Sequence, residues 1–237
     1  MQVTERDEQM LEWLRAVRMA EMSSLRWVLG GFSGAGEPVS LRKAQQWVAR
    51  CREAGLVDDA RPSYQSSSVV WATFRMVDDK LRKMPAPDLL RQTVRHDLAV
   101  ASVAARYVCA GWTWSNDYGS DKQRHHADGV AVRGDVRELV EVELTVKTLN
   151  RYSKIFTSHD ERMRFDGVTS VMYLTNERVK PAIDERIERR VFVDDRPRFT
   201  VLPVIDVWGR VQDDRWPYDT PRFTPVGRVS EDQSHAG

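Results

Sequence analysis

The spacing of apolar and polar residues predicts three helices followed by a hairpin in the first third of the chain. The helices are expected at residues 5–20, 24–30 and 41–54. Ser40 is placed to cap the third helix, and Gly55 is placed to end it. The stretch "GLVDDARPSYQSSSVVWATFRM" then reads as a strand, a polar loop and a second strand. This order of elements is that of a winged helix-turn-helix domain, which we expect to cover residues 1–84.

The third expected helix has one apolar and one polar, basic face. The inward stripe is expected to be Leu41, Ala44, Val48 and Cys51. The opposite face carries Arg42, Lys43, Gln46 and Arg50, with Gln45 beside them. Such side chains suit the phosphates and base edges of a DNA major groove, and Arg61 and Tyr64 of the hairpin loop are placed to reach a neighbouring groove or backbone. The alternatives are a solvated helix face and a protein-docking module.

A second set of elements follows a proline-rich boundary. Pro85 and Pro87 interrupt any preceding helix, so we expect a second domain to cover residues 85–205. The pattern predicts helices near 88–110, 150–166 and 178–190, and strands near 127–133, 138–146, 170–175 and 199–205. Strands that alternate with helices indicate an α/β layer fold. Residues 206–237 are expected to form an irregular C-terminal tail, with the last dozen disordered.

The segment "LVEVELTVK" alternates apolar and polar residues, as a strand does. Side chains of a strand alternate between its two faces, so Glu141, Glu143, Thr145 and Lys147 are expected on one face. One interpretation is a surface strand with its polar side in water. The other is an interior strand, whose carboxylates need partners or a metal ion. Asp128 on the preceding strand would complete that metal site.

The metal interpretation assigns a role to each of these side chains. Asp128, Glu141 and Glu143 would bind Mg²⁺ or Mn²⁺, because hard cations prefer carboxylate oxygens. Lys147 would orient or help to deprotonate a water molecule beside the ion. The ion would polarise a phosphate and stabilise its developing charge, and the product would be a cut phosphodiester.

Composition narrows the class of protein. The chain has 237 residues, a hydrophobic content of 41%, a charged content of 30% and a net charge of +1, which is typical of a soluble globular protein. Two cysteines, Cys51 and Cys109, exclude a disulfide scaffold and a cysteine-rich zinc site. The charged N-terminus is not a signal peptide, and no apolar run reaches membrane-spanning length. We therefore expect a cytoplasmic protein without a membrane partner.

We expect the histidines and tryptophans of the second domain to have structural roles and not to bind a metal ion or DNA bases. Adjacent residues of an extended segment face opposite sides, so His125 and His126 are not expected to bind one ion together. His159 is expected to be solvated. Trp112 and Trp114 are expected to pack in the core.

Several short motifs together resemble one family. "GLVDD", "RHDLAVASVAARY", "HADGVAV", "EVELTVK" and "LNRYSKI" resemble, in order and spacing, pieces of the replication-relaxation family of plasmids, phages and other mobile elements. The resemblance implies a winged helix joined to a PD-(D/E)xK domain of the restriction-endonuclease-like fold.

The resemblance also implies roles for individual residues. Asp128 corresponds to the metal-binding acid, Glu141 or Glu143 to the second carboxylate, and Lys147 to the lysine. Asp117 could stand near the early acid that some of these folds use. Arg151, just beyond the lysine, is expected to contact a phosphate whether or not the domain is catalytic. The lysine departs from the usual Glu-x-Lys pattern by one step of the strand, roughly 7 Å.

The expected function is therefore DNA binding in a plasmid, phage or other mobile element. One hypothesis is a metal-dependent endonuclease or nickase that acts in replication or mobilisation. The alternative is a non-catalytic transcriptional or replication regulator, whose second domain mediates dimerisation or protein contacts. A protein-interaction module is a third alternative. The expected partners are double-stranded DNA and a second copy of the chain.

Overall fold

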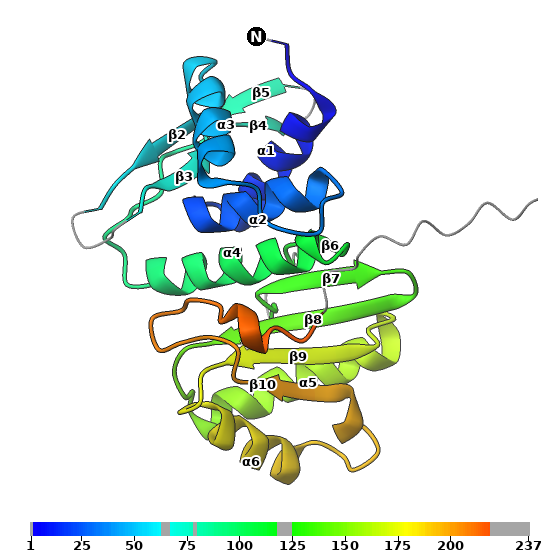
Figure 1. Cartoon of the computed structure of the whole chain (residues 1–237). Coiled ribbons are helices and arrows are strands. Elements are labelled where there is room, and N and C mark those ends of the chain that lie inside the picture. The colour runs from blue at the N-terminus through cyan, green and yellow to red at the C-terminus, as the bar shows by residue number, and fades with distance from the viewer. Residues whose placement is uncertain (1, 63–66, 78–79, 118–124, 219–237) are drawn as a thin grey trace, which may run out of the picture.

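The structure is a computed structural model that describes residues 2–62, 67–77, 80–117 and 125–218. Over these residues it is a mixed α+β protein with six α-helices and three β-sheets, in agreement with the expected mixture of helices and strands. Two small sheets lie with the N-terminal helices, and a five-stranded sheet lies on the other side of the helix α4 (Figure 1). None of the described helices is long and apolar enough to span a membrane.

The N-terminal elements follow the predicted order, with additional short strands. They are α1 (Glu5–Val17), β1 (Ala20–Glu21), α2 (Met22–Phe32), α3 (Leu41–Glu53), β2 (Val57–Ala60) and β3 (Val69–Ala72). Strands β2 and β3 form the expected antiparallel hairpin, and β1 pairs with β3 to give the order β1-β3-β2. Strands β4 (Phe74–Val77) and β5 (Lys80–Lys83) form a second hairpin that the pattern did not predict.

Local capping explains where the first helices begin. The Thr4 side chain accepts a hydrogen bond from the Asp7 amide, and the Asp7 side chain accepts one from the Thr4 amide, which is a capping box at the start of α1. Ser40 caps α3 as expected, because its Oγ accepts a hydrogen bond from the Lys43 amide at 3.3 Å. One predicted core position is wrong: Leu41, in the first turn of α3, is exposed, and Trp47 is buried instead.

Helix α4 (Val94–Cys109) belongs to two cores. Small residues on one side, among them Ala101 and Ala105, pack in the core of the N-terminal elements, where α2 is its neighbour. Tyr107, on the other side, packs against the five-stranded sheet. The helix was expected to start at Asp88, but that side chain accepts a hydrogen bond from the Leu90 amide, a local turn that competes with a helix.

The five-stranded sheet has the order β10-β9-β8-β7-β6. Its strands are β6 (Thr113–Ser115), β7 (Gly129–Arg133), β8 (Val136–Glu143), β9 (Ser170–Thr175) and β10 (Phe199–Leu202). Strands β6, β7 and β8 are antiparallel, whereas β8, β9 and β10 are parallel. The sequence predicted four of these strands but not β6, which has three residues.

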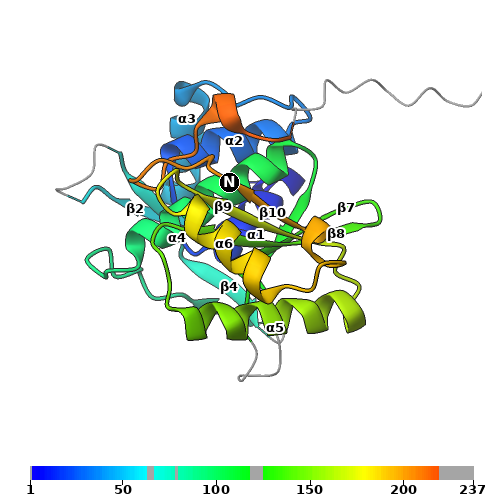
Figure 2. The same ribbon diagram turned by 90° about the horizontal axis from the view of Figure 1, so that it is seen from below.

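Helices cover both faces of this sheet. Helix α4 covers one face, and α5 (Leu149–Phe165) and α6 (Lys180–Arg190) pack on the other. Figure 2 shows α5 and α6 from below, on the side away from the N-terminal helices. Strand β8 is therefore interior, and the surface-strand interpretation is wrong. Glu141 and Glu143 are only 1% and 3% exposed.

The end of β8 and the C-terminal segment differ from the sequence prediction. Strand β8 ends at Glu143, so Thr145 and Lys147 lie in the connection to α5 and not on the strand. The part of the C-terminal tail that the structure describes, residues 206–218, is mostly irregular, but it packs on α4 and β8 through Trp216 and Tyr218. The last dozen residues, expected to be disordered, lie outside the described ranges.

Candidate functional site

The three predicted metal-binding carboxylates each have a different partner. Asp128, directly before β7, accepts a hydrogen bond from the Val142 amide at 2.7 Å and lies 3.3 Å from His96 Nε2. Glu143, at the end of β8, pairs with the Lys147 ammonium. Glu141 contacts two histidines. The structure therefore brings these residues to one region of the sheet, but it does not gather their oxygens into a single group.

Glu141 lies where β8 packs against α5, opposite Tyr173 of β9. Its Oε1 is 2.6 Å from His125 Nε2 and 3.1 Å from His159 Nε2. Burial raises the pKa of Glu141, but the hydrogen bond from His125 and the contact with His159 outweigh burial and hold that pKa well below its ordinary value. These contacts therefore favour the charged form of the carboxylate, and a buried charge requires compensation.

His159 corrects a sequence expectation. It was expected to be solvated, yet its side chain is 0% exposed, between Tyr173 and Phe199. Burial lowers the pKa of His159, although Glu141 acts in the opposite direction. The helical spacing of Tyr152, Ile155, Phe156, His159 and Met163 is the signal that would have found it, because these residues form the buried stripe of α5.

His125 was also assigned no ligand role, and the structure places it beside Glu141. Ser158 Oγ donates to the His125 carbonyl at 3.2 Å, so α5 fixes the backbone of this segment next to His159. The neighbouring His126 lies away from this cluster, with its Nδ1 4.0 Å from Asp117.

Lys147 reaches the same region from the connection between β8 and α5. Its amide donates to Tyr152 Oη at 3.4 Å, and its ammonium contacts Glu143. Burial lowers the pKa of Lys147, while the charges of Glu141 and Asp128 act in the opposite direction. Lys147 is thus close enough to both carboxylates to be influenced by them, although it is not on the strand.

Asp117 has a structural partner. Its carboxylate accepts a hydrogen bond from the Ala127 amide at 2.8 Å and pairs with Arg162 of α5, which is 7% exposed. These contacts hold the segment before β7 against the helix. They give Asp117 a clear role in positioning His125 and Asp128, which follow in the chain.

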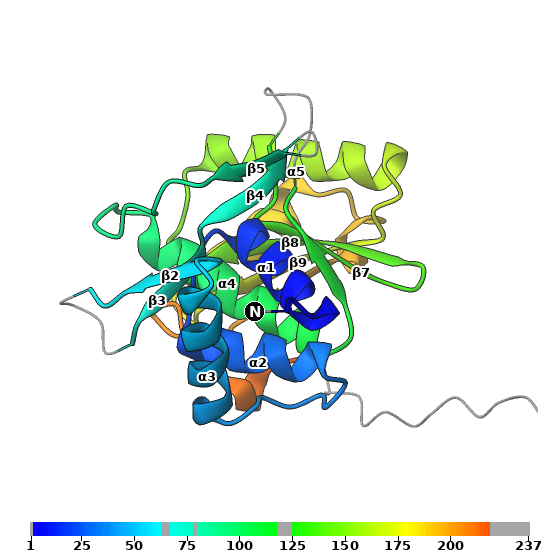
Figure 3. The same cartoon turned by 90° about the horizontal axis from the view of Figure 1, so that it is seen from above.

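The predicted DNA-binding residues divide into two groups. Arg42, Lys43, Gln45 and Gln46 are exposed on α3, and their side chains have no hydrogen bond or ion pair with other residues in the part of the chain that is described. Figure 3 shows this helix from above, with the β2–β3 hairpin beside it. Arg61 and Arg151 are also exposed, and Tyr64 lies outside the described residues.

Arg50 does not belong to this exposed group. Its guanidinium donates to both oxygens of Asp7, at 2.5 and 3.0 Å, and Asp7 is fully buried. A bidentate pair with a buried carboxylate fixes the side chain between α3 and α1. This pair gives Arg50 a structural role, and its contact with DNA stays a prediction.

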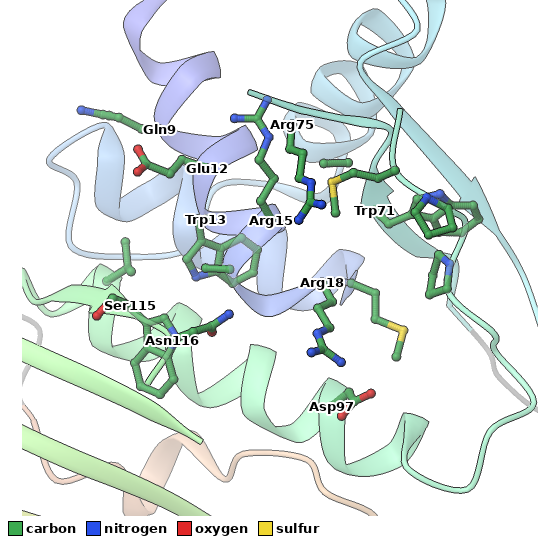
Figure 4. Close-up of a pocket in the computed structure, with 18 of the residues that line it drawn as sticks. Gln9, Glu12, Trp13, Arg15, Arg18, Trp71, Arg75, Asp97, Ser115 and Asn116 are labelled. Carbon is green, nitrogen blue, oxygen red and sulfur yellow. The ribbon is translucent and has the colours of Figure 1, made fainter. Parts of the chain in front are cut away.

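A cavity of about 1080 Å³ lies elsewhere, between the N-terminal elements and α4. Figure 4 shows Trp13, Arg15 and Arg18 from α1 and its end, with Arg75 and Trp71 across from them. None of the residues predicted to bind metal or DNA lines this cavity. The histidine–glutamate cluster is thus a separate site, between β8 and α5.

Comparisons of the chain with protein-family models, with curated proteins and with solved structures found no match.

Proposed function

We propose that this chain binds double-stranded DNA through the exposed face of α3. The observation that carries the proposal is the set of four neighbouring polar side chains, Arg42, Lys43, Gln45 and Gln46, which have no partner among the described residues. Cationic side chains bind phosphates, and amide side chains bind base edges in the major groove. The face has no acidic residue until Glu53 at the end of the helix, so little opposes the approach of a polyanion.

The order of the elements supports two units with different roles: the N-terminal helices, and the elements from α4 onward, which we call the second unit. Three helices and the β2–β3 hairpin favour a winged helix, in which α3 enters the major groove. The run α4-β6-β7-β8-α5-β9, with Asp128 before β7 and Glu141 on β8, favours a restriction-endonuclease-like second unit. Together with the motifs that resemble replication-relaxation proteins, these features make the DNA of a plasmid, phage or other mobile element the proposed target.

Phosphodiester cleavage is the second candidate function. It is favoured by the position of Lys147, which is close enough to Asp128 and Glu141 for their charges to raise its pKa. Against it stands the burial of Glu141, whose carboxylate is already contacted by two histidines. A non-catalytic DNA-binding regulator needs only the α3 face, so we propose regulation as the primary role.

The direct test is a titration of labelled duplex DNA with the double variant Arg42→Ala/Lys43→Ala. Loss of two phosphate contacts should weaken binding by roughly tenfold or more at low salt and reduce the slope of log K against log salt by about two. Its matched control is Arg189→Ala/Arg190→Ala at the end of α6, which removes the same charge from another exposed helix. Equal losses in both variants would reduce the effect to net charge and contradict the proposal.

The same DNA, incubated with Mg²⁺ or Mn²⁺, separates the two candidates. Binding without nicking supports the regulator. Nicking that disappears in Lys147→Ala would instead establish the nuclease and would show that the second unit is catalytic.

A further inference from the structure

Two imidazole rings and one carboxylate lie close together, two of the three groups buried and one partly exposed. They come from three separate parts of the chain: His125 from the segment before β7, Glu141 from β8 and His159 from α5. One ligand atom from each residue lies within 4.8 Å of the other two. Within the described ranges, no other group of three or more His, Cys, Asp or Glu residues meets this condition.

The two ring nitrogens of His159 are buried and lack hydrogen-bond partners among the described residues. Its side chain is 0% exposed, and neither ring nitrogen makes a hydrogen bond within the described part of the chain. Its Nε2 lies 3.1 Å from Glu141 Oε1, without the geometry of a hydrogen bond. A buried polar atom with no hydrogen-bond partner is costly, and native structures rarely keep one without a reason.

We propose that His125, Glu141 and His159 bind one divalent first-row transition-metal ion of the Zn²⁺ type. Imidazole nitrogen suits these ions, and a set of two histidines and one glutamate is one of their recurrent ligand sets. The ion would satisfy His159 Nε2 and would compensate the buried charge of Glu141. Mg²⁺ prefers oxygen ligands and near-ideal octahedral geometry, so this ligand set disfavours it.

The distances are compatible with such an ion after a small adjustment. Ligand atoms at about 2.1 Å from a tetrahedral metal ion are about 3.4 Å apart. The nitrogen–oxygen distances are 2.6 Å for His125 and 3.1 Å for His159, so the ring of His125 needs to move by less than an ångström or so. His125 can make that movement, because its side chain is 21% exposed and its segment is not part of a helix or strand.

His125 is the exposed member of the site. Its side chain is 21% exposed, whereas those of Glu141 and His159 are 1% and 0% exposed. Three protein ligands leave the fourth position of a tetrahedral ion for water or an exogenous ligand, and His125 marks the side from which that ligand would enter. All three ligands belong to the five-stranded sheet, the segment before β7 and the helix α5, so metal binding here does not depend on DNA binding by α3.

The test is a titration of the untagged, chelator-treated full chain with Co²⁺. We expect one equivalent to bind with the visible absorption of a four-coordinate site, and Zn²⁺ to displace it. At a hundredfold excess over Kd, the ion should raise Tm by about 5–10 °C, because it binds the folded state. Mg²⁺ at the same concentration should leave the Co²⁺ absorption unchanged.

Matched variants decide whether these three residues are the ligands. His125→Ala should weaken Co²⁺ binding by about a hundredfold, since one of three ligands is lost, and it should fold because the residue lies on the surface side. His159→Asn should abolish the absorption. The control His126→Ala changes the adjacent histidine and should bind normally, and Arg42→Ala/Lys43→Ala should do so too.

Three results would overturn the proposal. The first is the absence of stoichiometric binding in the wild type. The second is equal affinity of His125→Ala and His126→Ala for Co²⁺. The third is displacement of Co²⁺ by an equal concentration of Mg²⁺, which would assign the ion to an oxygen-rich site.

Discussion

At the residue scale, the buried carboxylate of Asp7 gives a structural role to Arg50, which the sequence also predicts to contact DNA. Asp7 is fully buried and accepts hydrogen bonds from Arg50 and from Trp47 Nε1 at 2.8 Å. Burial raises the pKa of Asp7, but the hydrogen bonds from Arg50, Thr4 and Trp47 outweigh burial and hold that pKa well below its ordinary value. Arg50 therefore stabilises the contact between α1 and α3.

Arg50→Ala should destabilise the protein, and Arg42→Ala should not. The first change leaves a buried charge without its strongest partner, which costs about 2–3 kcal/mol when the arginine is itself partly exposed. The second removes an exposed side chain and should stay within about 0.5 kcal/mol of the wild type. Urea denaturation measures both. An Arg50→Ala protein of unchanged stability that binds DNA weakly would restore the original assignment.

The pKa of a second residue, His96, leads us to predict that the stability of the protein depends on pH. Partial burial lowers the pKa of His96, but hydrogen bonds with Asp128 and Asp97 and the nearby Val142 carbonyl raise it to about 10. The protonated form is thus favoured in the folded state. Its stabilising contribution is fully present below pH 6.5, the value of an unperturbed histidine, and is lost as the pH rises from there to about 10.

His96→Gln should remove this part of the pH dependence. Because 36% of the His96 side chain is exposed, solvent screens the pair, and we expect a loss of about 1 kcal/mol at pH 6 and almost none at pH 10. Unfolding free energies measured across this range, with His126→Gln as the control histidine, test the sign. A difference between wild type and His96→Gln that grows with pH would contradict it.

At the scale of elements, periodicity predicted those segments whose local pattern agrees with their packing. Helices α3, α5 and α6 and strands β7, β8 and β9 have clear periods and lie close to their expected positions. The end of β8 was misplaced because the alternation continues through Thr145 and Lys147, although the chain leaves the sheet after Glu143. Strand β6 was missed because three residues are too few to show a period.

The sequence predicted the glutamate of the candidate site but not its histidine partners. Alternation placed Glu141 and Glu143 on one face, the helices expected before and after the strand favoured an interior position, and the structure confirms that Glu141 is buried. The two histidines lie 16 residues before and 18 residues after the glutamate in the sequence, and tertiary packing brings them to it. Local pattern gives the face of a residue but not its partner in another element.

At the scale of the whole molecule, the segment 206–218 joins parts that the sequence treated as independent. Asp213 accepts hydrogen bonds from Arg106 of α4 at 2.7 and 2.9 Å, and the Arg106 guanidinium lies 4.2 Å from the ring centroid of Trp27 in α2. Tyr218 donates to Glu138 of β8 at 2.8 Å. One segment therefore contacts the helix that is shared by both cores and the central part of the sheet.

This arrangement predicts that a change in the C-terminal segment affects the N-terminal helices. Asp213→Ala leaves Arg106, which is 6% exposed, without its carboxylate. The expected loss is about 1–2 kcal/mol, less than for a fully buried pair because Asp213 is itself exposed. Hydrogen exchange should accelerate in α2 and α4 as well as in the segment, since Arg106 links all three.

Asp214→Ala is the control. It removes the neighbouring exposed carboxylate, which has no partner in the described ranges, and should change neither stability nor exchange. Faster exchange confined to residues 206–218 in Asp213→Ala would show that the segment is only an appendage of the sheet.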